Sequence, residues 1–182
     1  MSRKVTAHLF NSLNGVVESP NLWQYDSFGP DEAQLMTEVI TPVTDVVIGR
    51  KLWSEWSGYW PQAEDPFGQW INPVRKHVVS TTLPDELPWN STRIAGDPVE
   101  YVKNLREHGE GGIIVSGGIE TVRSLFLAGL VDELILTTHP VVTNAGRRLF
   151  DESVPTTRLQ LLSATPTPPG NVIMRYALRQ PE

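Results

Sequence analysis

The sequence predicts one α/β domain, in which a mixed, mainly parallel sheet is covered by helices on both faces. Short apolar segments typical of buried strands alternate with segments of helical periodicity. The last two predicted strands, 158–164 and 171–178, are joined by the short proline-rich turn TPTPPG, which favours an antiparallel pair at one edge. No internal repeat or linker divides residues 1–182, so we expect a single domain.

The first half of the chain is predicted to hold two strands and one long helix. Residues 3–10 and 44–49 are apolar enough for strands. A helix is expected to begin at Pro30, because proline suits the first helical turn and Asp31 and Glu32 complement its positive end. Its apolar residues share one face at helical spacing: Ala33, Met36, Val39 and Ile40.

The region after residue 49 is rich in aromatic residues. A brief helical turn is expected first, and the Pro- and Gly-rich segment 57–73 is predicted to be a loop with Asp65 in a turn. Five of the six tryptophans lie between Trp23 and Trp70. These rings either fill a core or form the wall of a pocket.

The second half continues the alternation of strands and helices. Strands are expected at 76–80 and weakly at 93–95, and a helix follows Asp97, which with Pro98 and Glu100 forms a capping box. The segment 113–136 is predicted to be a strand, two glycines, a helix and a second strand. Gly117 and Gly118 either permit tight packing or let a ligand approach the backbone.

Composition excludes several classes of function. The formal net charge of −6 argues against a nucleic-acid groove, and the absence of cysteine excludes disulfides and thiolate metal sites. No apolar run is long enough to span a bilayer and no signal-peptide core is evident, so we expect a cytoplasmic protein without a membrane partner. The four histidines lack metal-ligand spacing, so no metal site is predicted.

Three predicted strand ends carry residues suited to phosphate. Because ligands of α/β sheets bind at the carboxyl ends of strands, these positions are candidate cofactor contacts. They combine glycines, cations and hydroxyls: Gly49, Arg50 and Lys51; Ser80 and Thr81; Ser116, Gly117, Gly118, Ile119, Glu120 and Thr121. Together they favour an elongated, multiply phosphorylated ligand, for which a dinucleotide fits best. The P-loop, GxGxxG and GxSxG motifs are all missing, which disfavours nucleotidases and hydrolases.

The chain resembles the dihydrofolate-reductase-like family that includes the RibD C-terminal reductase domain of riboflavin biosynthesis. The resemblance rests on segments in the same order: VTAHLFNSLNGVV, DVVIGRKLWSEW, KHVVSTTL and the long block GGIIVSGGIETVRSLFLAGLVDELILTTHPVVTNAGRRLF. It implies a three-layer α/β/α fold, NADPH as cofactor, a small-molecule substrate and a homodimer. It also implies that Arg50 binds the adenosine 2′-phosphate, that Gly117 to Thr121 hold the pyrophosphate, and that Ala7 lies beside the nicotinamide.

The substrate side is less determined. Relatives often carry SLDG where this chain has Asn14, whose amide can orient a substrate but cannot act as an acid. Asp31 and Glu32 are the candidate proton donors by position, although acidic residues in a first helical turn usually complement the dipole. Trp23, Phe28, Trp53 and Trp56 either wall a flat heterocycle or belong to the core. Two hypotheses stay open: an NADPH-dependent reductase, and a non-catalytic binding protein that retains the fold.

Overall fold

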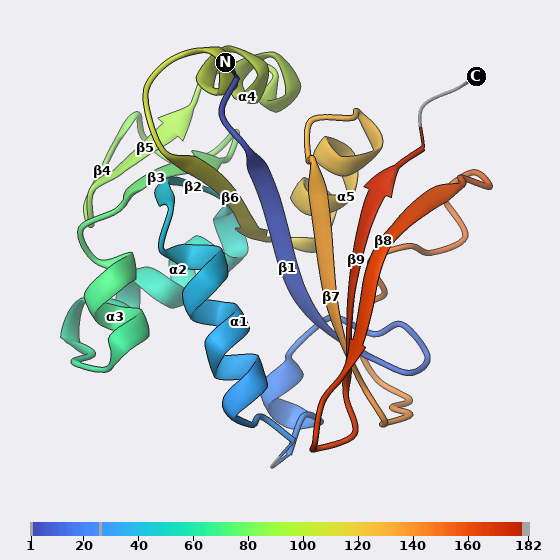
Figure 1. Cartoon of the computed structure of the whole chain (residues 1–182). Coiled ribbons are helices and arrows are strands. Elements are labelled where there is room, and N and C mark those ends of the chain that lie inside the picture. Colours follow the sequence, from blue (N-terminus) through green and yellow to red (C-terminus); the bar gives the residue numbers. More distant parts are fainter. Residues whose placement is uncertain (1, 26, 180–182) are drawn as a thin grey trace.

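The computed structural model describes residues 2–25 and 27–179, which form a nine-stranded sheet between two layers of helices (Figure 1). The strands are β1 (Val5–Ser12), β2 (Val43–Gly49), β3 (Arg75–Val79), β4 (Glu86–Leu87), β5 (Ser91–Ile94), β6 (Gly112–Gly117), β7 (Glu133–His139), β8 (Leu159–Pro166) and β9 (Val172–Leu178). The α-helices are α1 (Pro30–Ile40), α2 (Arg50–Tyr59), α3 (Pro66–Ile71), α4 (Pro98–Glu107) and α5 (Ile119–Leu127). Two short 3₁₀ helices are η1 (Pro20–Leu22) and η2 (Trp60–Gln62).

The sheet is parallel at its centre and antiparallel at both edges. Its strand order is β4-β5-β3-β2-β6-β1-β7-β9-β8. The neighbours from β5 to β7 pair in parallel, whereas β4, β9 and β8 pair antiparallel with their neighbours. The predicted mixed sheet with an antiparallel C-terminal hairpin is therefore confirmed. Because β2, β3 and β6 are neighbours, the ends of these strands lie along one edge.

Two apolar cores lie on the two faces of the sheet. In one, Val102 of α4 and the buried face of α5 pack on residues such as Ala7 and Val115. In the other, Leu35 of α1, Trp53 of α2 and Ile71 of α3 pack on the opposite face. Figure 1 shows the same division, with α1, α2 and α3 on one side of the sheet. Burial on both faces explains why the central strands are continuous apolar runs.

The predictions for residues 50–73 were wrong. The expected helical turn is the ten-residue helix α2, and the expected loop contains η2 and α3. The carboxylate of Asp65 accepts hydrogen bonds from the N–H groups of Phe67 and Gly68, so it caps α3, and Pro66 occupies the first helical position. A six-residue helix is too short to show a hydrophobic period, which is why the pattern failed to reveal it.

The buried face of α1 also differs from the prediction. Val39 is buried as predicted, but Ala33 is exposed and Leu35, which was not predicted, is buried. Glu32 is fully buried on the same face, because its carboxylate has partners in the segment that connects β8 and β9. A charged residue in a buried stripe cannot be found from apolar spacing alone.

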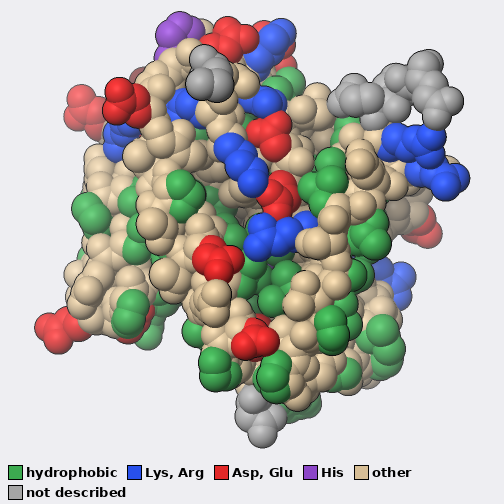
Figure 2. All heavy atoms as spheres, viewed as in Figure 1, with side chains coloured by type: hydrophobic (Ala, Val, Ile, Leu, Met, Phe, Trp, Pro, Cys, Tyr) green, Lys and Arg blue, Asp and Glu red, His purple; other side chains and the backbone are tan. Residues whose placement is uncertain are grey.

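Charged side chains also bridge strands on the face drawn in Figure 2, where acidic and basic groups lie next to one another. Glu133 of β7 pairs with Lys4 at 2.5 Å and with Arg175 of β9 at 2.6 Å. These pairs tie the antiparallel hairpin to the parallel part of the sheet. In the described part of the chain, no helix is long and apolar enough to cross a membrane.

A buried ionic network joins β2 and β3 near their N-terminal ends. Asp45 is fully buried and pairs with Arg3, with His77 at 2.9 Å and with Arg75 at 3.1 Å. Burial by itself raises the pKa of the Asp45 carboxyl, but hydrogen bonds with His77, Arg3 and Thr44 and the Arg3 charge hold it well below its usual range. The carboxylate is therefore ionised in the folded protein.

We expect Asp45→Asn to lower the free energy of unfolding at neutral pH by about 3–5 kcal/mol, because Arg3 then stays buried without its counter-charge. An aspartate in the unfolded chain titrates near pH ~4, above its value in the folded protein. Its stabilising contribution is therefore complete above that pH and is lost as the pH falls below it. Urea unfolding at about pH 7 and pH 3 should show the difference between the two proteins shrinking in acid.

Asp85→Asn is the matched control. Asp85 also pairs with an arginine, Arg93, but its side chain is 80% exposed. An exposed pair contributes at most about 1 kcal/mol, so this variant should unfold like the wild type. Equal losses from the two substitutions would contradict the role assigned to Asp45.

Candidate functional site

The first residues of α2 and α5 meet at the end of the central strands. Gly49 ends β2 and caps α2, and Gly118 follows β6 and caps α5. A Cβ atom on Gly49 would lie 3.1 Å from both the Gly118 nitrogen and Thr121 Oγ1, which is closer than most side-chain contacts, so glycine suits this approach. Neither helix has a side chain that hydrogen-bonds to its first N–H groups. Two sets of free donors and two positive dipole ends therefore converge at one place.

The adjacent glycines Gly117 and Gly118 serve different purposes. Gly117 has φ 142° and a Cβ there would meet Leu52 Cδ2 at 2.7 Å, so this glycine is required by conformation and packing. A Cβ on Gly118 would meet nothing closer than 4.0 Å, so the space beside its backbone is open. The two roles considered for this pair therefore fall on different residues: Gly117 is needed for the backbone conformation, and Gly118 leaves room for a ligand.

A cavity of about 610 Å³ lies beside this contact. Its lining includes Gly117, Gly118 and Ile119 from the start of α5 and Lys51 and Leu52 from the first turn of α2. The cavity continues along β1 and the inner sides of α1, α2 and α3. The apolar residues that line this part are Phe10, Phe28, Met36, Val39, Ile40, Trp56, Trp60, Phe67 and Trp70. We refer to the part near Gly117 and Gly118 as the glycine end.

Two cations and one carboxylate of the cavity lining lie at the glycine end. Glu18 Oε1 is 3.6 Å from Lys51 Nζ and 3.1 Å from Arg147 Nε, and the Arg147 N–H donates to Glu18 Oε2 at 3.1 Å. Arg147 also approaches Glu120, in the first turn of α5, at 3.5 Å. Desolvation raises the pKa of Glu18, but the Arg147 hydrogen bonds and the charges of Arg147 and Lys51 lower it overall. An ionised carboxylate thus bridges two cations beside the free helix donors.

His8 lines the cavity from β1. Burial, with smaller effects from the Arg175 and His139 charges, lowers its pKa to about 4, so the ring is neutral at physiological pH. Its Nε2 atom is 2.9 Å from Thr137 Oγ1. A neutral imidazole can donate or accept a hydrogen bond, and this one can therefore orient a polar group in the cavity.

The structure brings only part of the predicted cofactor set to the cavity. The predicted residues that line it are Lys51, Ser116, Gly117, Gly118 and Ile119. Gly49, Arg50, Glu120 and Thr121 surround the glycine end without lining the cavity. Ala7 lies in the core on the other face of the sheet, and the next residue, His8, lines the cavity instead.

Ser80 and Thr81 follow β3, which pairs with β2 through Val79 and Gly49. The Ser80 hydroxyl accepts hydrogen bonds from the N–H groups of Thr82 and Leu83, each at 3.1 Å, so it holds a turn together. Thr81 is exposed. Neither side chain lines the cavity, although both follow the carboxyl end of β3, at the same edge of the sheet as Gly49.

Glu32 and Asp31 do not line the cavity, and their surroundings do not suit a proton donor. Glu32 accepts hydrogen bonds from Thr167 Oγ1 at 2.6 Å, Asn171 Nδ2 at 2.7 Å and the Gly29 N–H at 2.8 Å. Burial raises its pKa, yet these hydrogen bonds lower it overall, so Glu32 is an ionised carboxylate that anchors α1 to the β8–β9 connection. Asp31 is exposed in the first helical turn, where it complements the dipole.

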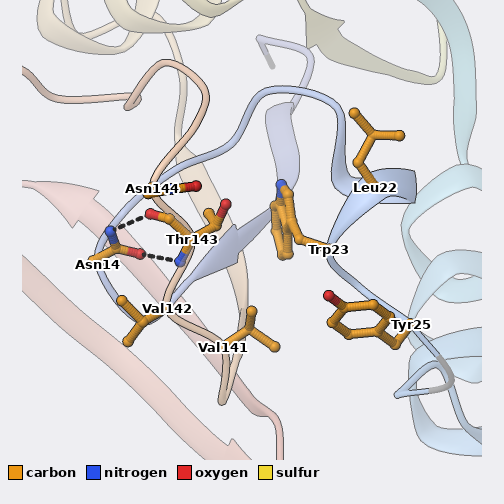
Figure 3. A pocket seen from close by; sticks show the side chains of 8 residues that line it. All are labelled: Asn14, Leu22, Trp23, Tyr25, Val141, Val142, Thr143 and Asn144. Carbon is orange, nitrogen blue, oxygen red and sulfur yellow. Dashed lines mark hydrogen bonds between the residues drawn. The ribbon is translucent and has the colours of Figure 1, made fainter.

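Asn14 and Trp23 line a second cavity of about 480 Å³, between the loop after β1 and the loop after β7 (Figure 3). Asn14 Nδ2 donates to the Thr143 carbonyl oxygen at 2.8 Å, and the Thr143 N–H donates to Asn14 Oδ1 at 3.2 Å. The amide therefore joins two loops. Trp23 is buried and donates to the Glu18 carbonyl oxygen at 2.9 Å.

The aromatic side chains are divided between core and cavity. Trp53 is buried in the core and donates to Ser91 Oγ at 2.9 Å, so it does not wall the cavity as predicted. Phe28, which was predicted, does line it. Trp56 lines it too, as predicted. For Trp60 and Trp70 the sequence left open whether they fill a core or wall a pocket, and Phe67 was assigned to a loop, because nothing in the sequence shows which face of α2 and α3 meets the sheet.

The ionisable cavity residues that the sequence did not single out are His8, Glu18, Glu55 and Arg147. Arg147 belongs to the block GRRLF, whose two arginines were the available signal. In the described part of the chain, no group of three or more His, Asp or Glu side chains is arranged to hold a metal ion.

The family model of the RibD C-terminal domain matches residues 3–173. The chain belongs to the RibD C-terminal domain family. It is 29% identical over 153 residues to the uncharacterized protein YyaP of Bacillus subtilis (strain 168), a match that covers 81% of this chain and 80% of that protein. The family membership agrees with the resemblance drawn from the sequence motifs.

Solved structures show the fold of this RibD C-terminal domain. A putative riboflavin biosynthesis protein from Shewanella sp. PV-4 superposes with a TM-score of 0.78 at 18% identity, covering 99% of this chain and 100% of that one. Dihydrofolate reductase from Enterococcus faecalis, complexed with NADP(H) and RAB-propyl, gives 0.66 at 17% identity with the same coverage. The domain therefore has a dihydrofolate-reductase-like fold.

The different roles of the glycines can be tested by stability. We expect Gly117→Ala to lower the free energy of unfolding by about 1–3 kcal/mol, because its φ of 142° disfavours a side chain and the methyl group would meet Leu52. Gly58→Ala in α2 is the control, since a Cβ there meets nothing within 4 Å. That change should be neutral or stabilise by up to about 1 kcal/mol. Thermal unfolding that ranks the two variants equally would contradict this assignment.

Proposed function

We propose that this RibD C-terminal domain is an NADPH-dependent reductase that transfers a hydride to a small heterocyclic substrate of the pterin or pyrimidine type. The observation that carries the proposal is the contact between the uncapped N-termini of α2 and α5 beside Lys51 and Arg147. Paired helix N-termini with adjacent cations are suited to a pyrophosphate. Family membership supports a reductase, and NADP(H) is bound in the Enterococcus faecalis structure.

The residues at the glycine end fit the phosphates of NADPH. Gly118 leaves open space next to its backbone, so phosphate oxygens can reach the first N–H groups of α5. Lys51 and Arg147 would then exchange the Glu18 carboxylate for the cofactor's phosphate oxygens. This exchange keeps both cations paired in the free and in the bound protein.

Arg50 is the candidate for the adenosine 2′-phosphate. It is exposed at the first position of α2, next to the glycine end. In the described part of the chain, its guanidinium has no carboxylate partner. A free guanidinium can bind a phosphate through two parallel hydrogen bonds.

NADPH would supply the hydride, and the chain would orient the acceptor and keep water out. The apolar walls from α1, α2 and α3 provide the water-poor environment. His8, neutral and at the cavity floor, would hold a polar atom of the acceptor by a hydrogen bond. Glu18 and Glu55 are the carboxyl groups of the lining, and neither is buried, so the proton would come from solvent or through His8.

The first test of this proposal is cofactor binding followed by tryptophan fluorescence. We expect saturable quenching by NADPH, and Arg50→Ala should reduce the preference for NADPH over NADH by about tenfold or more, because the arginine contacts a group that NADH lacks. Lys103→Ala removes an exposed lysine from α4, outside the cavity, and should change neither affinity. A protein that binds neither dinucleotide would contradict the proposal, and one that binds NADPH without oxidising it with any pterin or pyrimidine would favour the non-catalytic alternative.

We also propose a homodimer that forms through β8. This strand is at the edge of the sheet and is largely exposed, with Leu161 54% and Leu162 48% exposed. An apolar edge strand with unpaired backbone groups favours pairing with a second copy. Light scattering should give twice the chain mass for the wild type and the monomer mass for Leu162→Lys. A monomeric wild type at micromolar concentration would contradict the proposal.

A further inference from the structure

Positive charge is not evenly distributed along the cavity. Helix α2 begins at the glycine end with Lys51 and runs past Trp56 toward Trp60. Since a helix rises about 1.5 Å per residue, Trp60 lies roughly 13 Å along the axis from Lys51. The second cation, Arg147, is also at the glycine end, because it contacts Glu120 of α5. Both cations of the lining therefore lie where the cofactor phosphates are proposed to bind.

The far part of the cavity is walled by a cluster of packed rings that we call the aromatic end. Its members are Trp56, Trp60, Phe67 and Trp70. Phe67 is at the centre of the cluster, with ring centroids 5.6 Å from Trp56, 4.7 Å from Trp60 and 5.2 Å from Trp70. The Trp56–Phe67 pair is edge to face and the other two pairs are tilted, and rings packed in this way form a stiff apolar wall that suits a flat ligand.

The other ionisable groups that line the cavity are Glu18, which pairs with both cations at the glycine end, Glu55, on the same helix as Trp56, and His8. Glu55 cannot supply a positive charge, and burial lowers the pKa of His8 to about 4, so its ring is neutral. A phosphate or carboxylate at the aromatic end would therefore lose its hydration without gaining a counter-charge, which is costly. The lining disfavours an anionic substrate.

The aromatic end also contains buried hydrogen-bond donors that have no acceptor. Trp60 Nε1 and Trp70 Nε1 belong to this end, and Gln24 Nε2 belongs to the lining from the segment after η1. These three donors are buried and have no hydrogen-bond acceptor within residues 2–25 and 27–179. All three residues line the cavity. A buried donor without a partner is unfavourable, and a ligand that carries acceptors would satisfy it.

We propose that the hydride acceptor is a neutral, planar heteroaromatic ring that carries hydrogen-bond acceptors and bears no phosphate or carboxylate. This inference rests on the proposed function, because it takes the glycine end to be occupied by the dinucleotide. It narrows the substrate to rings without an ionised tail. The apolar wall binds the faces of the ring, and the indole and amide donors bind its edge.

The test is calorimetric titration of the NADPH-loaded protein with three bicyclic probes. Quinoxaline-2-carboxamide and quinoxaline-2-carboxylate have the same shape and differ in charge, and naphthalene-2-carboxamide lacks the ring nitrogens. We expect the neutral quinoxaline to bind about tenfold or more tightly than its carboxylate. It should bind about threefold or more tightly than the naphthalene.

Single substitutions assign the effect to the aromatic end. Trp60→Phe keeps a ring but removes the N–H donor, so the preference for quinoxaline over naphthalene should fall while NADPH affinity is unchanged. Trp89→Phe is the matched control, because Trp89 does not line the cavity and its N–H group already donates to Asn72 at 2.8 Å. It should leave all three probe affinities unchanged, and thermal unfolding checks that both variants fold.

The outcomes separate this inference from the proposed function. Equal or tighter binding of the carboxylate would overturn the inference, and so would a protein that binds NADPH but none of the three rings. In both cases the cofactor site would still stand. A protein that does not bind NADPH would overturn the proposed function and the inference with it.

Discussion

The approach of Gly49 to Gly118 is the constraint on which the site depends. A Cβ atom on Gly49 would lie 3.1 Å from the Gly118 nitrogen and from Thr121 Oγ1, so glycine at this position lets the ends of β2 and β6 lie together without displacing these atoms. That contact places the starts of α2 and α5 side by side and leaves their first N–H groups unpaired. The direction that α2 takes from there places Lys51 at one end of the cavity and Trp56 further along it.

The cavity combines two environments that a single helix connects. At the start of α2, cations and free backbone donors favour negative charge, and by its end the surroundings are packed rings. The carboxylate of Glu18 keeps Lys51 and Arg147 paired at the polar end. A reductase needs this arrangement, since it must hold a highly charged dinucleotide against an acceptor in a water-poor space.

Stability and function are assigned to opposite ends of the same strands. The buried network of Asp45, Arg3 and His77 holds β2 and β3 together near their N-terminal ends, away from the cavity. Glu32 has a comparable role beneath α1, which it joins to the β8–β9 connection. Because fully hydrogen-bonded carboxylates provide this rigidity, the strand ends beside the cavity can keep unpaired donors.

Local sequence determined the order of strands and helices, the antiparallel C-terminal pair and the glycines with which α2 and α5 begin. These features depend on hydrophobic period, turn residues and proline positions, all of which act over a few neighbouring residues. The motif order also identified the family that the RibD C-terminal match confirms. Local sequence was insufficient for α3, whose six residues are shorter than the period needed to recognise a helix.

The tertiary structure alone decided which residues reach the cavity. Arg147 is 96 residues from Lys51 along the chain, and the two meet only because Glu18 from the loop after β1 bridges them. Trp53 and Trp56 are three residues apart, yet the first fills the core and the second lines the cavity. Glu32 had the residue type and position of a proton donor, but three hydrogen bonds keep it ionised and structural. Long-range contacts set the burial and the partners of each side chain, and these determine its chemistry.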